Sequence, residues 1–240
     1  MITGPKALEE QRKISKSLVI VATSVFIILI SLGTWQAHRL EWKEGLISKY
    51  QAELKRTPIA LADLPTVKPK KFRRVQVIGK YLHRLQIFVG PKPYRGNAGW
   101  HVVTPFQLET GDIILINRGW VPLSFRNNLE AKIEKRNNKS AVVGVINWPR
   151  KRNYFDPVNI PEKNQWFRVD TAAIANKLHL KNVPSYWISI NKKKKSNKFP
   201  IGGVGTKMPI NNHLQYVWTW FGLAFGLLIL SIVYWRQRYR

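Results

Sequence analysis

The sequence predicts a membrane protein in which two transmembrane helices flank one extracytoplasmic domain of mainly antiparallel β structure. Two apolar runs lie near the ends of the chain, at residues 18–33 and 217–235. Between them, segments rich in Val, Ile, Phe and Trp are separated by Gly and Pro, a pattern typical of strands joined by turns. Strands at this spacing predict a partly closed barrel or a sandwich of the α+β class.

The two apolar runs differ in length. Residues 217–235 carry no charged side chain, and a helix of this length covers about 28 Å of hydrocarbon. Residues 18–33 form a shorter run, but Lys16 can snorkel below it and Trp35 can lie in the membrane interface above it. No small-x-small cleavage site follows the first run, so we interpret it as a retained anchor rather than a cleaved signal peptide.

Basic residues close to the two runs predict the orientation of the chain. They are Arg12, Lys13 and Lys16 before the first run and Arg236, Arg238 and Arg240 after the second. Because cytoplasmic flanks carry an excess of Lys and Arg, both tails are expected in the cytoplasm. No transit-like segment rich in Ser and Arg precedes the first run, which favours a bacterial inner membrane over an organelle. The predicted layout is a cytoplasmic tail (1–17), a transmembrane helix (18–34), a periplasmic β-rich domain (35–210), a second transmembrane helix (211–235) and a cytoplasmic tail (236–240).

Secondary structure within the central domain follows from local patterns. Strands are expected at 72–82, 86–94, 100–108, 113–121, 141–148 and 185–190, and helices at 40–54, continuing from the first anchor, and at 171–180. Asp170 is the expected N-cap of the second of these helices.

The chain is strongly basic, with 40 Lys and Arg residues, 13 Asp and Glu residues and a net charge of +27. Such a charge favours anionic partners. Nucleic acid is not expected on the outer side of an inner membrane, which leaves anionic lipid headgroups, acidic protein surfaces or a carboxylate-bearing ligand. The alternative is that Lys- and Asn-rich stretches such as 136–139 and 192–195 are solvated loops without a partner.

Residue types and motifs that the chain lacks restrict its chemistry. It has no cysteine, which excludes disulfides, thiolate metal sites and a cysteine nucleophile. It has no nucleophile elbow, phosphate loop or G-x-G-x-x-G fingerprint, and none of its five histidines lies three or four residues from another. The sequence therefore predicts a protein that is not an enzyme and has no local metal motif.

His213 stands at the start of the second predicted span, after two asparagines. On a helix beginning there, the residues that share its face are Tyr216, Val217, Trp220 and Ala224. An imidazole beside such an aromatic and apolar stripe suits a haem, because haem iron binds a neutral imidazole nitrogen. The alternative is an interface residue beside an Asn cap, with Trp218 and Trp220 as ordinary interface anchors.

Gly222 and Gly226 form a G-x-x-x-G step in the same span. Such a step allows close approach of another helix, either the first span or a helix of a partner.

A series of short motifs runs through the chain in a fixed order. They are Gly33-Thr34-Trp35-Gln36 with Arg39 and Trp42-Lys43, Gly79-Lys80-Tyr81-Leu82, Gly99-Trp100-His101-Val102-Val103-Thr104-Pro105-Phe106, Asn117-Arg118-Gly119-Trp120-Val121-Pro122, Asn159-Ile160-Pro161 with Trp166-Phe167 and Asp170, Asn212-His213-Leu214-Gln215-Tyr216, and Thr219-Trp220-Phe221. In this order, within a two-span topology, they resemble the surfeit-locus-one family of cytochrome oxidase assembly proteins. The resemblance covers residues 33–235.

The resemblance implies an inner-membrane chaperone that helps to mature subunit one of haem-copper cytochrome c oxidase, around the insertion of haem a. It implies that His213 ligates the iron of a transiently bound haem a, with Tyr216 and Trp220 beside it. The implied partners are cytochrome c oxidase subunit one, haem a synthesis enzymes and membrane lipids, and no nucleic acid is expected. A second axial ligand is not assigned and can come from the partner subunit.

Arg118 and Trp120 match a family signature, and we favour a structural role in which Gly119 makes a turn and its two neighbours support the domain. Two other functions stay open. One is a structural scaffold that holds subunit one without binding haem, and the other is a basic module that binds anions.

Overall fold

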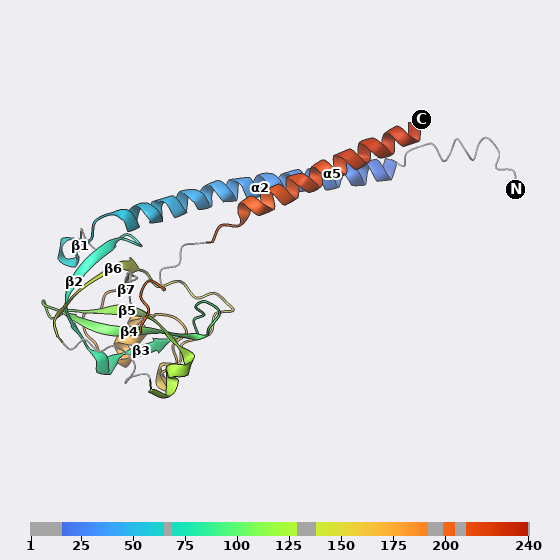
Figure 1. The fold of residues 1–240 in the computed structure, drawn as a ribbon. Helices are drawn as coiled ribbons and strands as arrows, with labels where there is room; N and C mark the ends of the chain where they lie inside the picture. Colours follow the sequence, from blue (N-terminus) through green and yellow to red (C-terminus); the bar gives the residue numbers. More distant parts are fainter. Residues whose placement is uncertain (1–15, 65–68, 129–137, 192–198, 205–209, 240) are drawn as a thin grey trace. The chain divides into compact units, whose positions relative to one another are not determined.

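The structure is a computed structural model that describes residues 16–64, 69–128, 138–191, 199–204 and 210–239. The chain divides into two compact units. We call the first, Met1–Ser48 with Pro209–Arg240, the helical unit, and the second, Lys49–Met208, the β unit. Figure 1 shows the helices and strands of both.

The helical unit contains two long helices, α2 (Lys16–Lys55) and α5 (His213–Tyr239). Both are long and apolar enough to cross a membrane, by length and composition. The 40 residues of α2 extend over about 60 Å, twice the thickness of a bilayer core. The predicted helix at 40–54 is therefore confirmed as a continuation of the first anchor, and the division between the two units falls within α2.

Hydroxyl side chains in the apolar parts of these helices bond to their own backbone. Ser31 Oγ donates to the Ile27 carbonyl at 2.7 Å, and Thr34 Oγ1 donates to the Ile30 carbonyl at 2.9 Å. In α5, Ser231 Oγ donates to the Leu227 carbonyl at 2.7 Å. Polar groups are thus satisfied within the helix, as an apolar solvent requires.

The β unit is a small barrel. Its strands are β1 (Ile59–Ala60), β2 (Arg74–Tyr81), β3 (Ile87–Val89), β4 (Gly99–Leu108), β5 (Ile113–Pro122), β6 (Ser140–Asn147) and β7 (Trp187–Ile190). They lie in the order β1-β2-β6-β7-β5-β4-β3, and a further pairing of β2 with β4 closes five of them into a ring. The β1–β2 and β5–β7 pairs are parallel and the others antiparallel. The prediction of a mainly antiparallel β domain is confirmed, and of the two predicted alternatives, a partly closed barrel and a sandwich, the structure shows the barrel.

Alternate residues of each strand point into the barrel and away from it. One buried apolar cluster takes residues from all five ring strands, namely Val75, Val77, Tyr81, Phe106, Ile114, Ile116, Val142, Ile146 and Ile188. It fills the interior. A second cluster uses the alternate positions on the outer face, among them Val103 and Leu115, and is covered by Trp166 and by Ile174 of α4 (Thr171–Lys177).

Most predicted elements of the β unit occur with shifted ends. The strand expected at 86–94 is limited to Ile87–Val89, because Pro91 and Pro93 have no N–H to donate to a strand ladder. The short β1 was not predicted. Asp170 caps α4 as predicted, since its Oδ1 accepts a hydrogen bond from Ala173 N at 3.1 Å.

Candidate functional site

The two helices of the helical unit pack through a small-residue contact. Gly33 of α2 is buried, and a Cβ added there would lie 2.8 Å from Cε1 of Phe221 in α5. Ala224, one turn further along α5, is only 1% exposed. The absence of a side chain at Gly33 therefore lets the Phe221 ring lie against the α2 backbone.

His213 is the first residue of α5 and lies against α2. Its Nδ1 atom is 2.7 Å from Oε1 of Gln36, on the turn after Gly33. Because an amide oxygen only accepts hydrogen bonds, Nδ1 carries the proton in this contact. In the neutral ring, Nε2 then has the free lone pair, which is the form that binds a metal.

The two other predicted site residues differ in their surroundings. Tyr216 is 50% exposed. Trp220 is part-buried, and its indole N–H is buried without a hydrogen-bond partner among the residues that the structure describes. Trp220 follows His213 by two turns, on the same side of the helix. This unpartnered donor beside the imidazole face is a place where an acceptor group of a bound molecule would be favourable.

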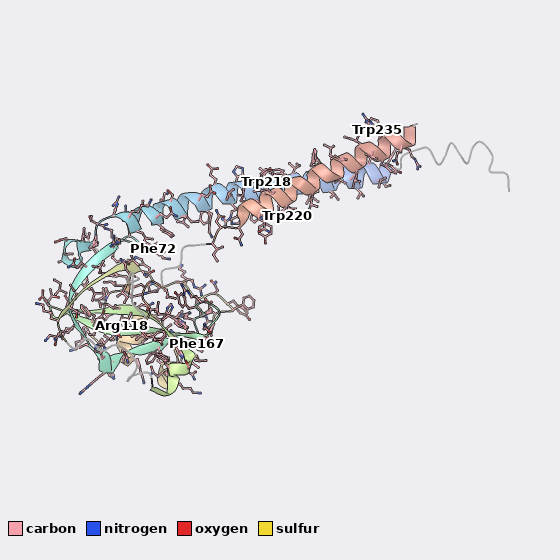
Figure 2. The ribbon with its side chains drawn as sticks, in the orientation of Figure 1. Phe72, Arg118, Phe167, Trp218, Trp220 and Trp235 are labelled. Carbon is pink, nitrogen blue, oxygen red and sulfur yellow. The ribbon has the colours of Figure 1, made fainter. Side chains whose placement is uncertain are left out.

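Other tryptophans mark the ends of α5. Trp218, near its start, is 73% exposed, and Trp235, near its other end, is 58% exposed. Figure 2 shows these two residues at opposite ends of the helix. This is the arrangement of interfacial anchors on a spanning helix.

Within the described residues, no group of three His, Cys, Asp or Glu side chains is placed to hold a metal ion. His213 therefore has no further such side chains beside it that would complete a metal site. His38, two residues beyond Gln36, is exposed, and an α-helix turns by about 200° over two residues, so it lies on another side of α2.

Helix α2 does not pack against Gly222 or Gly226. A Cβ added at either position would meet nothing within 4 Å. The sequence left two roles open for this step, contact with the first span or contact with a helix of a partner. The structure of the helical unit excludes contact with the first span.

The Asn117-Arg118-Gly119-Trp120 motif lies inside β5, so the prediction of a turn at Gly119 is wrong. The β4–β5 register shifts between Val102 and Val103, which pair with Gly119 and Asn117, so Arg118 is the extra residue of a β-bulge. Gly119 has a φ of +123°, and a Cβ there would lie 2.1 Å from the Ile201 carbonyl oxygen. The bulge requires glycine for both reasons.

The two neighbours of Gly119 support the β unit. Arg118 is 3% exposed, with its guanidinium carbon 5.0 Å from the centre of the Tyr81 ring and Nη1 3.3 Å from His83 Nδ1. Trp120 is 4% exposed and donates from Nε1 to the Lys92 carbonyl at 2.8 Å. These contacts are those of residues that hold the end of the barrel together.

Gln36 is the residue of this site that sequence reasoning missed. It belongs to the Gly33-Thr34-Trp35-Gln36 motif, and its position one turn after Gly33 is the only sequence signal for it. Nothing in the sequence pairs it with a histidine that follows much later in the chain.

Comparison with known proteins places the chain in a family. A SURF1 family model matches residues 23–225. A SURF1-like protein of Rickettsia felis is 31% identical over 226 residues, covering 92% of this chain and 97% of that protein. A SURF1-like protein of Monosiga brevicollis is 30% identical over 213 residues (84% and 81%), and Surfeit locus protein 1 of Mus musculus is 31% identical over 220 residues (83% and 71%). With the helix pair and the barrel described above, these matches show that the chain belongs to the SURF1 family.

Proposed function

We propose that this protein is an inner-membrane assembly factor for haem-copper cytochrome c oxidase, which holds haem a in passing at His213 and presents it to subunit one. Membership of the SURF1 family supports a role in oxidase assembly. The helix pair supports action within the membrane, where both the cargo and subunit one reside. In this function the protein carries and presents a cofactor and catalyses no reaction.

The observation that carries the proposal is the Gln36–His213 hydrogen bond at 2.7 Å. A histidine that binds a metal commonly donates its other ring N–H to an oxygen acceptor, which fixes the tautomer and the orientation of the ring. Gln36 fulfils this role for His213. The ring is thereby prepared to offer Nε2 to the iron of the cargo.

The surroundings of His213 fit a porphyrin. Tyr216, Val217 and Trp220 provide apolar and aromatic surface on the following turns of α5, and a porphyrin needs such surface. The buried indole N–H of Trp220 lacks a partner among the described residues, and polar substituents at the edge of haem a can accept its hydrogen bond. The single protein ligand leaves the other axial position of the iron for a residue of subunit one, which suits transfer.

The chain is expected to place both tails in the cytoplasm and the β unit in the periplasm of a bacterium. The basic residues Arg236 and Arg238 at the end of α5 support this orientation. Subunit one and the enzymes that make haem a are the proposed protein partners. Membrane lipids surround the two helices.

An optical spectrum tests the proposal. The full chain, His213→Ala and the control His38→Ala are purified in a mild neutral detergent from cells that make haem a, at matched expression. We expect a haem a band in the wild-type protein and in His38→Ala, and its loss in His213→Ala. Absence of haem from all three, with oxidase assembly still dependent on the protein, would contradict haem binding and favour a scaffold that holds subunit one.

A further inference from the structure

The outer face of the barrel changes from apolar to polar along the strands. On β5, Leu115 belongs to the outer apolar cluster, and Asn117, the next residue on that face, is buried and polar. Asn117 pairs with Ser189 of β7, and Asn147 of β6 donates to the Ser189 hydroxyl at 3.1 Å. These three side chains are between 2% and 5% exposed. Buried polar side chains cost stability unless they are bonded, so each polar atom of this row needs a partner.

The hydrogen bonds of this row leave one acceptor free. Asn117 Oδ1 accepts a hydrogen bond from the Gly119 N–H at 3.0 Å, and the amide nitrogen of Asn117 lies 3.3 Å from His101 Nδ1. Asn147 uses its amide nitrogen for Ser189 and for the Val145 carbonyl at 3.2 Å. Its Oδ1 atom accepts no hydrogen bond from the described residues. A side chain that is 95% buried thus keeps an unused polar atom.

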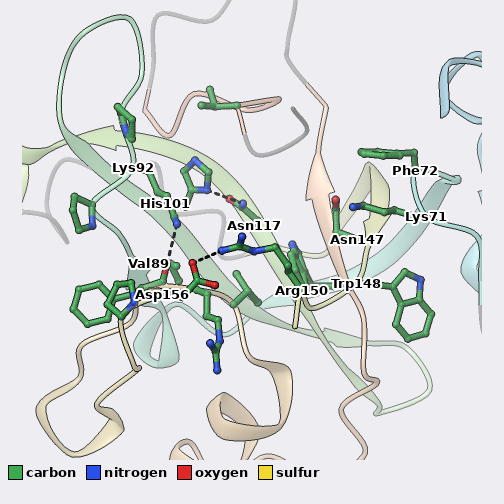
Figure 3. A pocket seen from close by; sticks show the side chains of 18 residues that line it. Lys71, Phe72, Val89, Lys92, His101, Asn117, Asn147, Trp148, Arg150 and Asp156 are labelled. Atoms are coloured by element: carbon green, nitrogen blue, oxygen red, sulfur yellow. Dashed lines mark hydrogen bonds and ion pairs between the residues drawn. The ribbon is translucent and has the colours of Figure 1, made fainter. Parts of the chain in front are cut away.

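A cavity of about 570 Å³ lies over this row. This volume is within the range of small-molecule sites, roughly 300–1,000 Å³. Figure 3 shows His101 and Asn117 bonded to each other at the cavity and Asn147 and Trp148 on another side of it. Further aromatic surface comes from Phe167 and Trp187. The cavity therefore combines flat apolar walls with a few polar groups, as ligand sites do.

The charges around the cavity are mostly positive. Four cationic side chains line it, Lys71, Lys92, Arg150 and Arg168, against one carboxylate, Asp156. Arg168 has a buried Nη1 without a hydrogen-bond partner among the described residues, and its nearest carboxylate oxygen, on Asp170, is 3.9 Å from Nη2. The site is thus suited to a negative group.

One carboxylate, that of Asp156, is already paired with one of these cationic side chains. Asp156 Oδ1 accepts from Arg150 Nη2 at 2.7 Å, and its Oδ2 accepts from Asn153 N at 2.8 Å. The hydrogen bond from Asn153 N and then the bond and charge of Arg150, with a weaker attraction from Arg168, outweigh the effect of burial and lower the pKa of Asp156 below its ordinary value. Asp156 therefore shows that the site stabilises a carboxylate and also competes with any incoming anion.

We propose that this cavity binds a small organic anion, a carboxylate or phosphate carried on an apolar ring or chain. The anionic group lies between Arg168 and Arg150 and competes there with Asp156. The apolar part lies against Phe167 and Trp187, and Asn147 Oδ1 accepts a hydrogen bond from a donor on the ligand. The site belongs to the β unit alone and does not depend on haem binding by the helical unit.

Isothermal titration of the full chain in a neutral detergent tests the proposal, with benzoate, phenyl phosphate, benzamide and inorganic phosphate as probes. We expect benzoate and phenyl phosphate to bind, and benzamide and inorganic phosphate to bind at least about tenfold more weakly, since charge-assisted bonds and ring burial both contribute. Dihexanoyl phosphatidic acid, used below its micellar concentration, distinguishes a lipid ligand from a soluble one when its affinity is compared with that of phenyl phosphate. Tighter binding than phenyl phosphate indicates a lipid headgroup, and weaker binding indicates a soluble metabolite.

Two variants change the affinity in opposite directions. Arg168→Gln should lower the affinity for benzoate roughly tenfold or more. Asp156→Asn removes the competing charge and should raise this affinity several-fold. A gain of affinity cannot result from misfolding. Arg84→Gln and Asp112→Asn make the same charge changes at exposed positions outside the cavity and should leave the affinity unchanged.

Several outcomes would overturn the proposal. Equal affinity for benzamide and benzoate would show an apolar cavity without anion selection. Equal affinity for inorganic and phenyl phosphate would show a bare ion site. Equal losses in Arg84→Gln and Arg168→Gln would show a diffuse effect of net charge, and no detectable binding of either organic anion at millimolar concentration would show no site.

Discussion

Gln36 Oε1 lies 2.7 Å from His213 Nδ1, although the two residues are 177 positions apart in the sequence. The contact joins the two apolar helices where α5 begins. It connects a residue of the first span's motif with His213, which the family resemblance implies as a haem ligand. The proposed function depends on this bond, because it determines which imidazole nitrogen is free.

Replacing Gln36 should weaken haem binding without removing the ligand. Gln36→Leu loses the acceptor for Nδ1–H, and loss of such a supporting bond commonly costs about 10- to 100-fold in metal affinity. Gln36→Glu keeps an acceptor and should keep the haem. Haem a per protein chain, from pyridine haemochrome spectra, is the measurement. Gln215→Leu, at an exposed position of α5, is the control, and haem retention by Gln36→Leu at the wild-type level would contradict the role of Gln36.

A side chain at Gly33 should separate the two helices. A Cβ there lies 2.8 Å from the Phe221 ring, so Gly33→Leu forces the ring or the helix to move, whereas Gly45→Leu on the same helix meets nothing within 4 Å at its Cβ. Because the chain has no cysteine, spin labels can be placed at single cysteines introduced at Val25 and Leu223, both exposed. We expect a longer and broader interhelix distance in Gly33→Leu only. An unchanged distance would refute the close contact.

Gly119→Ala should destabilise the β unit far more than Gly111→Ala does. Both glycines have positive φ, +123° and +91°, but only Gly119 faces a backbone oxygen, 2.1 Å from its added Cβ. Backbone strain alone costs about 1–2 kcal/mol, and a clash with backbone in addition should raise the loss above about 3 kcal/mol. Urea unfolding followed by circular dichroism measures the difference. Equal losses would show that the bulge can move away from Ile201.

The stability of the β unit should decrease at high pH through Tyr186. Burial raises the pKa of Tyr186 above its ordinary value of 10.0, and its ring packs 5.5 Å from Trp148. Above pH ~10 the unfolded chain loses the phenolic proton while the folded chain still holds it, so stability falls as pH rises through the folded-state pKa. Tyr186→Phe should remove this part of the loss, as measured by urea unfolding at about pH 8 and about pH 11. Tyr154→Phe, at an 88% exposed position, should not.

Local patterns were sufficient for elements that depend on neighbours in the chain. The apolar runs that became α2 and α5 were recognised because a membrane span is defined by its own composition. The N-cap at Asp170 was recognised because its partner, Ala173, is three residues away. The strands were recognised because segments rich in Val, Ile, Phe and Trp are separated by Gly and Pro, and in β2 the structure then buries every second residue.

Features that join distant parts of the chain could not be predicted in this way. The bulge at Arg118 follows from the shifted pairing of β5 with β4 and from the approach of Ile201 to Gly119. The motif was visible in the sequence, but its conformation was not, because a glycine is compatible with both a turn and a bulge.

The sequence by itself determined two terminal spans and a mainly antiparallel β domain between them, because composition and local patterns encode these properties. The ordered motifs added the family resemblance, which implies His213 as a haem ligand. Only the tertiary structure decided that Gln36 orients His213, that Gly222 and Gly226 lie away from α2, and that Asn117, Asn147 and Ser189 lie side by side under a cationic cavity. Such contacts depend on strand register and helix rotation, which are set by packing of the whole chain and not by the order of neighbouring residues.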